Sequence, residues 1–173
     1  MSQIAAPVSF EIRSEVPADA QAIETVTVAA FQDAPHASGT EQHIVNALRR
    51  TGNLAVSLVA TADAAVIGHV AISPVSISGN ASGWFGLGPI SVLPKHQRQG
   101  VGSRLICEAL RILLERDASG CVVLGEPEYY GRFGFKANPE LILPGVAPEY
   151  FQVVAFDTSR PTGIVAYHEA FEA

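Results

Sequence analysis

A short stretch of glycine and polar residues has the composition of an anion-binding loop. It reads Gln97-Arg98-Gln99-Gly100-Val101-Gly102 and is followed directly by Ser103. An apolar run precedes it and apolar residues recur at helical spacing after it, which predicts a strand, a loop and the start of a helix. The first N–H groups of a helix lack partners within it, and the helix dipole is positive there. Because Gly100 and Gly102 carry no Cβ, the pattern predicts close binding of a phosphate or pyrophosphate.

Other phosphate-binding loops do not fit this stretch. A Walker loop requires Gly-Lys-Ser/Thr at its end, and none follows here. The dinucleotide-binding fingerprint requires a third glycine, which is missing. Taken alone, the two glycines are explained equally well by a tight strand-to-helix turn that needs them for packing.

The wider context of the loop resembles the GNAT acyltransferases. Gln97-x-x-Gly100-x-Gly102 after an apolar strand is similar to the acyl-CoA pyrophosphate loop of that family, Arg/Gln-x-x-Gly-x-Gly/Ala. The segment Tyr130-Gly131-Arg132-Phe133-Gly134-Phe135 resembles the Tyr-x-x-x-Gly-Phe stretch of the same family. Residues 127–135 are most similar to a bacterial subgroup of predicted N-acetyltransferases. The resemblance is strongest over residues 86–135.

The resemblance implies an N-acetyltransferase that moves an acetyl group from acetyl-CoA directly to a primary amine in a ternary complex. It places the donor to the reacting oxyanion, a backbone N–H, on the central strand near Ser91 and Val92. The residues that it assigns to acyl-CoA are Ile90, Ser91, Val92, Gln97, Arg98, Gln99, Gly100, Val101, Gly102, Ser103, Tyr130 and Arg132.

Tyr130 matches the position at which many family members carry a general acid. A phenol with a pKa of about 10 is protonated at neutral pH and can donate its proton to a departing thiolate. Tyr129 is the rival candidate if the register differs by one residue. The aromatic side chains at 129, 130, 133 and 135 are equally consistent with core packing.

The sequence leaves the general base open. Some family members carry a glutamate on the central strand, but residues 84–93 contain no carboxylate. Glu126, at the end of the next strand, and Glu41, at the start of the second helix, are the candidates, although a helix N-terminus favours glutamate for electrostatic reasons alone. His36 and His96 have suitable intrinsic pKa values. A water relay without any single base is a further alternative.

Composition narrows the class of protein. The chain has 173 residues, a net charge of −6, 48% hydrophobic and 16% charged residues, which is typical of one globular domain spanning residues 1–173. The negative charge argues against a nucleic acid partner. The chain contains no apolar run of membrane-spanning length and no basic leader, so we expect a cytoplasmic protein that does not associate with membranes. The five histidines form no cluster, so we expect no metal.

Most basic residues lie in the middle of the chain. Local attraction of a polyanionic cofactor explains this distribution, as do ordinary i,i+4 ion pairs on a helix surface. Lys95, Arg98 and Arg104 are the best cofactor candidates by position.

The order of elements predicts an α/β fold. Alternating apolar residues over 8–12 indicate a strand, Pro17 opens a helix reaching residue 31, and Thr40 caps a second helix. Strands over 54–60 and 66–73 form a hairpin with its turn at 61–63, and 76–83 is a loop. The strand at 84–93 should bulge or part from a neighbouring strand at Pro89, and a right-handed crossover helix leads to a parallel strand at 121–124. A short helix ends near Gly134, and strands at 151–156 and 163–168 form a late hairpin. The resemblance implies a twisted mixed sheet flanked by helices, with its central parallel strands splayed for the cofactor arm.

Two other functions remain open at this point. A catalytically silent acyl-CoA-binding domain with the same fold would bind CoA without turnover, and an unrelated phosphate-binding domain would prefer nucleotides. The acceptor is a small-molecule or peptide amine that no motif identifies. The resemblance also allows a homodimer, since family members often pair.

Overall fold

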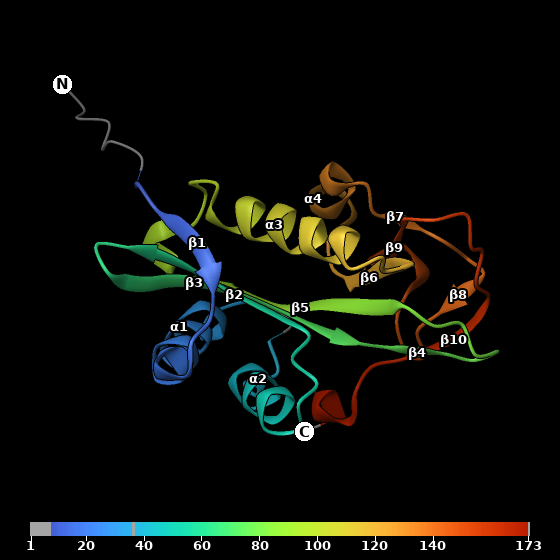
Figure 1. Ribbon diagram of the computed structural model, residues 1–173, viewed down its shortest axis with the longest axis horizontal. Coiled ribbons are helices and arrows are strands. Elements are labelled where there is room, and N and C mark those ends of the chain that lie inside the picture. The colour runs from blue at the N-terminus through green and yellow to red at the C-terminus, as the bar shows by residue number, and fades with distance from the viewer. Residues whose placement is uncertain (1–7, 36, 173) are drawn as a thin grey trace.

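A twisted sheet with helices on both faces forms the body of the molecule (Figure 1). The computed structural model describes residues 8–35 and 37–172. The strand order in the large sheet is β1-β2-β3-β5-β6-β9-β7, and only β5 and β6 run parallel to each other. These strands are β1 (Glu11–Ser14), β2 (Val56–Ala62), β3 (Ala65–Pro74), β5 (Trp84–Val92), β6 (Gly120–Leu124), β7 (Lys136–Ala137) and β9 (Phe151–Ala155).

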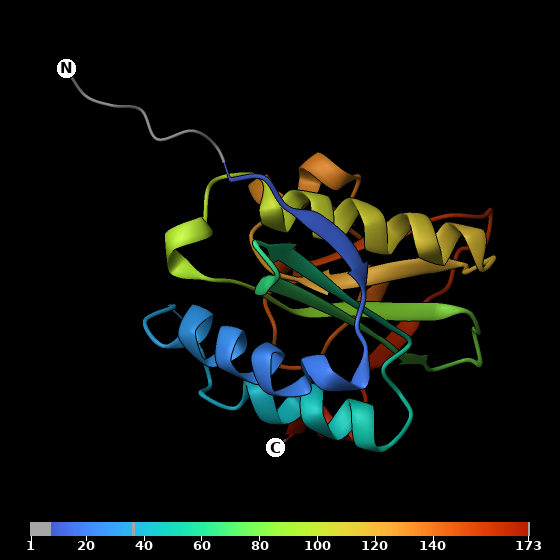
Figure 2. The same cartoon turned by 60° about the vertical axis from the view of Figure 1, so that its left-hand side comes forward.

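The helices lie in two layers. α3 (Val101–Glu115) and α4 (Pro127–Tyr130) cover one face of the sheet, whereas α1 (Ala20–Phe31) and α2 (Glu41–Arg50) lie side by side on the other (Figures 1 and 2). Short 3-10 helices occur at Pro17–Asp19, Pro94–His96, Gly131–Phe133, Pro148–Tyr150 and Glu169–Glu172. The α3 crossover between the parallel strands β5 and β6 is therefore confirmed.

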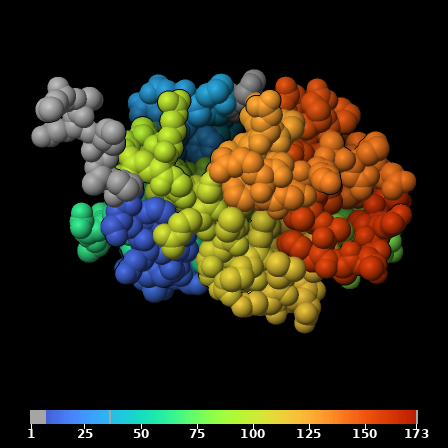
Figure 3. Space-filling model, turned by 90° about the horizontal axis from the view of Figure 1, so that it is seen from above, coloured from blue at the N-terminus to red at the C-terminus, as the bar shows by residue number. Residues whose placement is uncertain are grey.

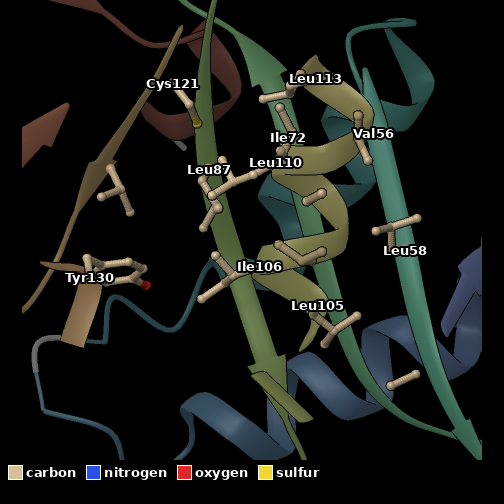
Figure 4. Close-up of a cluster of buried hydrophobic side chains, with 14 of the residues drawn as sticks. Val56, Leu58, Ile72, Leu87, Leu105, Ile106, Leu110, Leu113, Cys121 and Tyr130 are labelled. Atoms are coloured by element: carbon tan, nitrogen blue, oxygen red, sulfur yellow. The ribbon is translucent and has the colours of Figure 1, made fainter. Parts of the chain in front are cut away.

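The apolar spacing of α3 explains why this helix covers the sheet. Its buried face carries Leu105, Ile106, Ala109, Leu110 and Leu113, which pack against residues of β2, β3 and β5 such as Leu58, Ile72 and Leu87 (Figure 4). Residues three and four apart lie on one side of a helix, so this spacing forms a continuous apolar stripe. On the opposite face, Ile23 of α1 and Val45 of α2 pack against Val59.

The predicted late hairpin is wrong. β9 pairs with β6 and β7 in the large sheet, whereas β10 (Gly163–Ala166) belongs to a separate small sheet in the order β4-β10-β8. β4 (Ser76–Ile77) occupies part of the predicted loop, and β8 (Leu141–Ile142) runs parallel to β10. Apolar alternation identifies the buried face of a strand but does not identify its neighbour. Burial of Ile77, Leu141 and Val165 in one cluster explains the second sheet.

Several predicted boundaries also differ. The β2–β3 turn lies at Asp63 and Ala64, which have φ values of 50° and 64°. β2 is therefore displaced towards the C-terminus without being longer, whereas β3 is longer than expected. Gly120 begins β6. Thr40 is at the N-cap of α2, but its side chain forms no capping hydrogen bond. Instead, Glu41 turns back and accepts a hydrogen bond from the Ser38 N–H at 2.7 Å.

The central parallel strands separate after four paired residues. β5 pairs with β6 only over Trp84–Leu87 and Gly120–Val123. On its other edge, β5 shifts register against β3 between the pairs Ile72–Leu87 and Val70–Ile90, so that Gly88 and Pro89 form a bulge. Proline cannot donate a ladder hydrogen bond. The bulge predicted at Pro89 is confirmed, and the strands are splayed beyond it.

His69 is a fully buried polar residue at the centre of the sheet. Its Nε2 lies 2.7 Å from Ser57 Oγ, and its Nδ1 has no partner in the described part of the chain. Burial, helped by the positive charge of Arg49, lowers the pKa of His69 to about 3. The folded protein therefore holds this imidazole neutral at physiological pH.

We expect His69 to make folding sensitive to mild acid. An unfolded histidine has a pKa of about 6.5, so below that pH the unfolded state binds a proton that the folded state refuses. The contribution is fully present above the unfolded pKa and is lost as pH falls towards the folded pKa of about 3, by up to ~1.4 kcal/mol per pH unit. The free energy of unfolding is measured with urea for the wild type and for His69→Gln between about pH 7 and pH 5. As the pH falls, it should decline less steeply for the variant than for the wild type. Exposed His43→Gln is the control, and parallel profiles for wild type and His69→Gln would contradict this account.

Candidate active site

The predicted anion-binding loop leads directly into α3. Gly100 is the N-cap residue with φ 84°, a left-handed conformation that favours glycine. The first hydrogen bond of the helix runs from the Arg104 N–H to the Gly100 carbonyl at 3.1 Å. The N–H groups of Val101, Gly102 and Ser103 therefore have no carbonyl partner within the helix. They form the positive end of a helix of 15 residues.

A cleft of about 630 Å³ lies at this helix end. In Figure 3 the lime-coloured loop before α3 lies between the blue α1–α2 region and the orange α4 segment. The predicted cofactor residues that line the cleft are Ile90, Val92, Gln97, Arg98, Gly100, Gly102, Ser103 and Arg132. Four further lining residues were not predicted for the cofactor: Ala30, Phe31, His96 and Tyr129. Ala30 and Phe31 come from α1, and only folding brings them here.

Four predicted cofactor residues do not line the cleft. Ser91 is 2% exposed, and its Oγ lies 3.4 Å from Thr27 Oγ1 on the α1 side of the sheet. The Val101 side chain is buried against Gly68. The Gln99 side chain holds the loop in place through two hydrogen bonds. Its Nε2 donates to the Lys95 carbonyl, and its Oε1 accepts from the Val8 N–H. Tyr130 lies deeper, between α4 and β5.

Backbone groups of β5 face the gap that β6 leaves open. The Leu93 N–H donates to the Ile67 carbonyl of the β3 side at 2.9 Å. Backbone directions alternate along a strand, so the N–H groups of Val92 and Ile90 point to the opposite side, beyond the last residue paired with β6. The Val92 carbonyl points the same way and accepts a hydrogen bond from Gln97 Nε2 at 3.0 Å. Ser91 is therefore excluded as the oxyanion donor, because its N–H faces β3.

The two neighbouring tyrosines have different surroundings. Tyr129 lines the cleft, and a Cβ added to Gly102 would lie 3.1 Å from its hydroxyl. The Tyr130 ring extends from α4 towards β5, with its hydroxyl directed to the region of Leu87 and Ile106 (Figure 4). Burial, with a smaller contribution from Tyr129, raises the pKa of Tyr130 to about 12. Tyr130 is therefore protonated at neutral pH.

A second pocket lies where β5 bulges. Its volume is about 660 Å³, and Leu87, Gly88 and Pro89 line it. The cleft at α3 contacts the next residue of the strand, Ile90, and the two cavities share Phe31. The two cavities therefore adjoin each other at the place where β5 leaves β6.

The candidate bases differ in position. Glu41 lines the second pocket and is 8% exposed. Glu126 is exposed and lines neither cavity. His96 lines the cleft, and His36 lies outside the described residues. The structure thus brings only Glu41 of the two carboxylates to a cavity at the split.

Only some of the basic residues near the loop line the cleft. Arg98 and Arg132 line the cleft, whereas Lys95 does not. Arg104 lies over the Phe10 ring, 4.7 Å from its centroid. Within residues 8–35 and 37–172, no group of His, Cys, Asp and Glu side chains has metal-ligating geometry. In the same residues, no helix is both long and apolar enough to cross a membrane.

Comparison with known proteins places this architecture in a family. A family model described as an acetyltransferase (GNAT) domain matches residues 53–137. The uncharacterized N-acetyltransferase YhbS of Escherichia coli K12 is 39% identical over 168 residues, which cover 92% of this chain and 97% of YhbS. The chain belongs to the GNAT acetyltransferase family.

Solved structures agree with this assignment. A GNAT family acetyltransferase from Brucella melitensis, in complex with acetyl-CoA, is 48% identical and has a TM-score of 0.85, covering 94% of this chain and 98% of that one. E. coli YhbS in complex with CoA is 35% identical in the structural alignment, with a TM-score of 0.88 and coverage of 99% and 97%. The N-acetyltransferase fold predicted from the loop and the Tyr130 segment is confirmed.

We expect Gly102→Asp to weaken CoA binding by more than about tenfold, or ~1.4 kcal/mol. The aspartate would introduce a side chain against Tyr129 and a negative charge at the helix end where the pyrophosphate is expected. Titration calorimetry with CoA measures the effect. Gln21→Glu, which adds the same charge at an exposed position of α1 outside the cleft, should bind normally. Equal affinity of a folded Gly102→Asp variant would show that the phosphates bind elsewhere.

Proposed function

We propose that this chain transfers an acetyl group from acetyl-CoA to a primary amine by direct attack in a ternary complex. The observation that carries the proposal is the separation of β5 from β6 after Leu87, between a cleft at the N-terminus of α3 and a second pocket. Such a gap lets a thioester enter from one side and an amine from the other. The named relatives, an N-acetyltransferase and an acetyl-CoA complex, support the choice of donor.

The cofactor would bind mainly to backbone groups. The pyrophosphate accepts hydrogen bonds from the N–H groups at the start of α3, with Arg98 and Arg132 nearby. The extended arm follows β5 and bonds to the backbone that faces the gap. As the amine attacks, negative charge develops on the thioester oxygen. An N–H of Ile90 or Val92 is placed to stabilise this charge, an interaction that strengthens in the transition state.

Tyr130 would protonate the departing CoA thiolate. Its raised pKa keeps the proton on the phenol until the thiolate forms. Its hydroxyl is directed towards β5, whereas Tyr129 lies against the loop at Gly102. Position therefore favours Tyr130 as the acid and Tyr129 as a cofactor contact.

The acceptor side would depend on Glu41. This carboxylate lines the second pocket, where an amine can approach the thioester. Glu126 keeps the role of alternative because it follows β6 directly, although it is exposed. Separate Glu→Gln variants distinguish the two, since the important one lowers turnover while CoA affinity is retained.

We also propose that the enzyme works in the cytoplasm on a small-molecule or peptide amine, as a monomer or a homodimer. Its cysteines, Cys107 and Cys121, are both free thiols in the structure. Free thiols fit a reducing compartment.

Turnover tests the proposal against the silent CoA-binding alternative. The protein is mixed with acetyl-CoA and a panel of primary amines, and thiol release is followed with a thiol reagent. We expect release that depends on the amine, and mass spectrometry should find one acetyl group on the amine. Tight CoA binding without release in any mixture would favour the silent binding module.

We expect Tyr130→Phe to lower kcat by about 10²–10⁴-fold, the usual contribution of general acid catalysis. The change keeps the ring packing against Tyr129 and Phe135 and removes only the hydroxyl. Steady-state kinetics measures kcat, and titration calorimetry measures the affinity for CoA, which should be nearly unchanged. Tyr129→Phe is the matched control with parental kcat. A loss confined to Tyr129→Phe would move the acid by one residue, and normal turnover of both would mean that the thiolate leaves without a tyrosine.

A further inference from the structure

The pocket at the β5 bulge has walls that are mostly apolar. They come from α1, α2, β6, the 143–146 segment and the C-terminal residues, and include Phe31, Ile44, Leu124, Leu143, Val146 and Phe171. Its volume of about 660 Å³ is in the range of small-molecule sites, 300–1,000 Å³. Leu87, Gly88 and Pro89 form the wall towards the cofactor cleft. A compact apolar ligand would bury its surface here and stay next to the gap.

Glu41, a residue that lines this pocket, has one carboxylate oxygen without a hydrogen-bond partner among the described residues. Glu41 is 8% exposed, and its Oε1 accepts hydrogen bonds from the Ser38 N–H at 2.7 Å and the Ser38 hydroxyl at 3.1 Å. Its Oε2 is buried with no hydrogen-bond partner among the described residues. Burial alone would raise the pKa of Glu41. The hydrogen bonds from the Ser38 N–H and hydroxyl offset burial, so the pKa of Glu41 lies below its usual range.

An ionised, buried and unpaired oxygen costs free energy unless a ligand supplies a donor. The best complement to a carboxylate is a positively charged donor, and an ammonium group has three N–H donors and no acceptor. Tyr167, which also lines the pocket, has a buried hydroxyl oxygen without a partner among the described residues. It can accept a hydrogen bond as well.

We infer that the acceptor is a small primary amine with a compact apolar body, and that Glu41 Oε2 binds its ammonium group before the proton is lost. The inference rests on the proposed function and specifies its acceptor. Glu41 is then a residue that selects a cationic amine, while the apolar walls select the rest of the molecule. A lowered pKa suits this binding role, because the carboxylate stays charged at neutral pH.

A long acyl chain from the cofactor is the rival occupant of an apolar pocket. It would fill the walls but leave Glu41 Oε2 unpaired. A highly polar or multiply charged amine would satisfy Glu41 but leave the apolar surfaces of Phe31, Leu143 and Phe171 exposed to water. Only an amine that is charged at one end and apolar elsewhere satisfies both.

Binding without turnover tests the inference. The protein saturated with CoA, which carries no acetyl group, is titrated calorimetrically with 2-phenylethylamine and with 2-phenylethanol, its uncharged counterpart. We expect the amine to bind at least about tenfold more tightly than the alcohol. Ethanolamine, which lacks the apolar body, should also bind at least about tenfold more weakly than 2-phenylethylamine. These wild-type comparisons require no variant to fold.

Glu41→Gln assigns the charge preference to one residue. Glutamine can still accept the hydrogen bonds of Ser38, so the start of α2 is retained, and the variant should bind amine and alcohol equally. Glu172→Gln removes an exposed carboxylate from the same pocket and should keep the wild-type preference. CoA affinity should be unchanged in both.

The contradicting outcomes are distinct. Equal binding of amine and alcohol by the wild type, or a preference that survives Glu41→Gln, would overturn the role of Glu41. If ethanolamine bound as tightly as 2-phenylethylamine, the claim that the acceptor has an apolar body would be wrong. Faster turnover with hexanoyl-CoA than with acetyl-CoA would assign the pocket to the acyl chain. Selective amine binding without thiol release would contradict the proposed enzyme activity, while the preference of the pocket for a charged amine with an apolar body would still hold.

Discussion

The structure depends on a pair of parallel strands that stops pairing halfway. β5 and β6 are hydrogen-bonded over Trp84–Leu87, and Gly88 and Pro89 then bulge from the ladder with β3. Backbone N–H and C=O groups must find partners, so a strand edge left open inside a domain is a place where a ligand can complete the bonding. The cleft and the apolar pocket both exist because of this opening. The helix layers and the second sheet hold its two sides apart.

The overall charge of the chain, which is −6, would give little help in binding the proposed polyanionic cofactor. Local geometry compensates, because the first N–H groups of α3 point into the cleft beside Arg98 and Arg132. Arg104, which lies over Phe10, shows that closeness in sequence does not make a cation part of the site. On the acceptor side the sign is opposite, since Glu41 is a buried anion in apolar surroundings. In the proposed reaction, the cofactor would thus bind in positively charged surroundings and the acceptor amine beside a negative charge, at the same gap.

Local chemistry made the loop before α3 and the bulge of β5 predictable. Gly100 needs a left-handed φ, Gly102 must leave room beside Tyr129, and Pro89 cannot stay in the ladder, so these residue types indicate their structure directly. Strand alternation is less informative. It identified the segments around residues 151–156 and 163–168 as strands but not that they enter different sheets, because pairing is decided by contacts distant in sequence. The sequence also did not show which way Ser91 faces. It was predicted at the cofactor, but its N–H faces β3 and its side chain faces α1.

The pocket proposed for the acceptor could not be predicted from the sequence. Phe31, Glu41, Leu124, Leu143 and Tyr167 come from five separate segments, and no spacing connects them. A glutamate at the start of a helix is ordinary, and only the unpartnered oxygen of Glu41 distinguishes it. Tyr167 belongs to no motif, and its ring packs against Gly86, which is distant in sequence.

A crystal structure of the protein with acetyl-CoA tests the central claim most directly. We expect the pyrophosphate at the N–H groups of Val101, Gly102 and Ser103, and the thioester carbonyl between β5 and β6 within hydrogen-bonding distance of the Ile90 or Val92 N–H. The acetyl methyl group should point towards the pocket that contains Glu41. A cofactor bound with its thioester outside the gap, or with its phosphates away from the start of α3, would contradict the account.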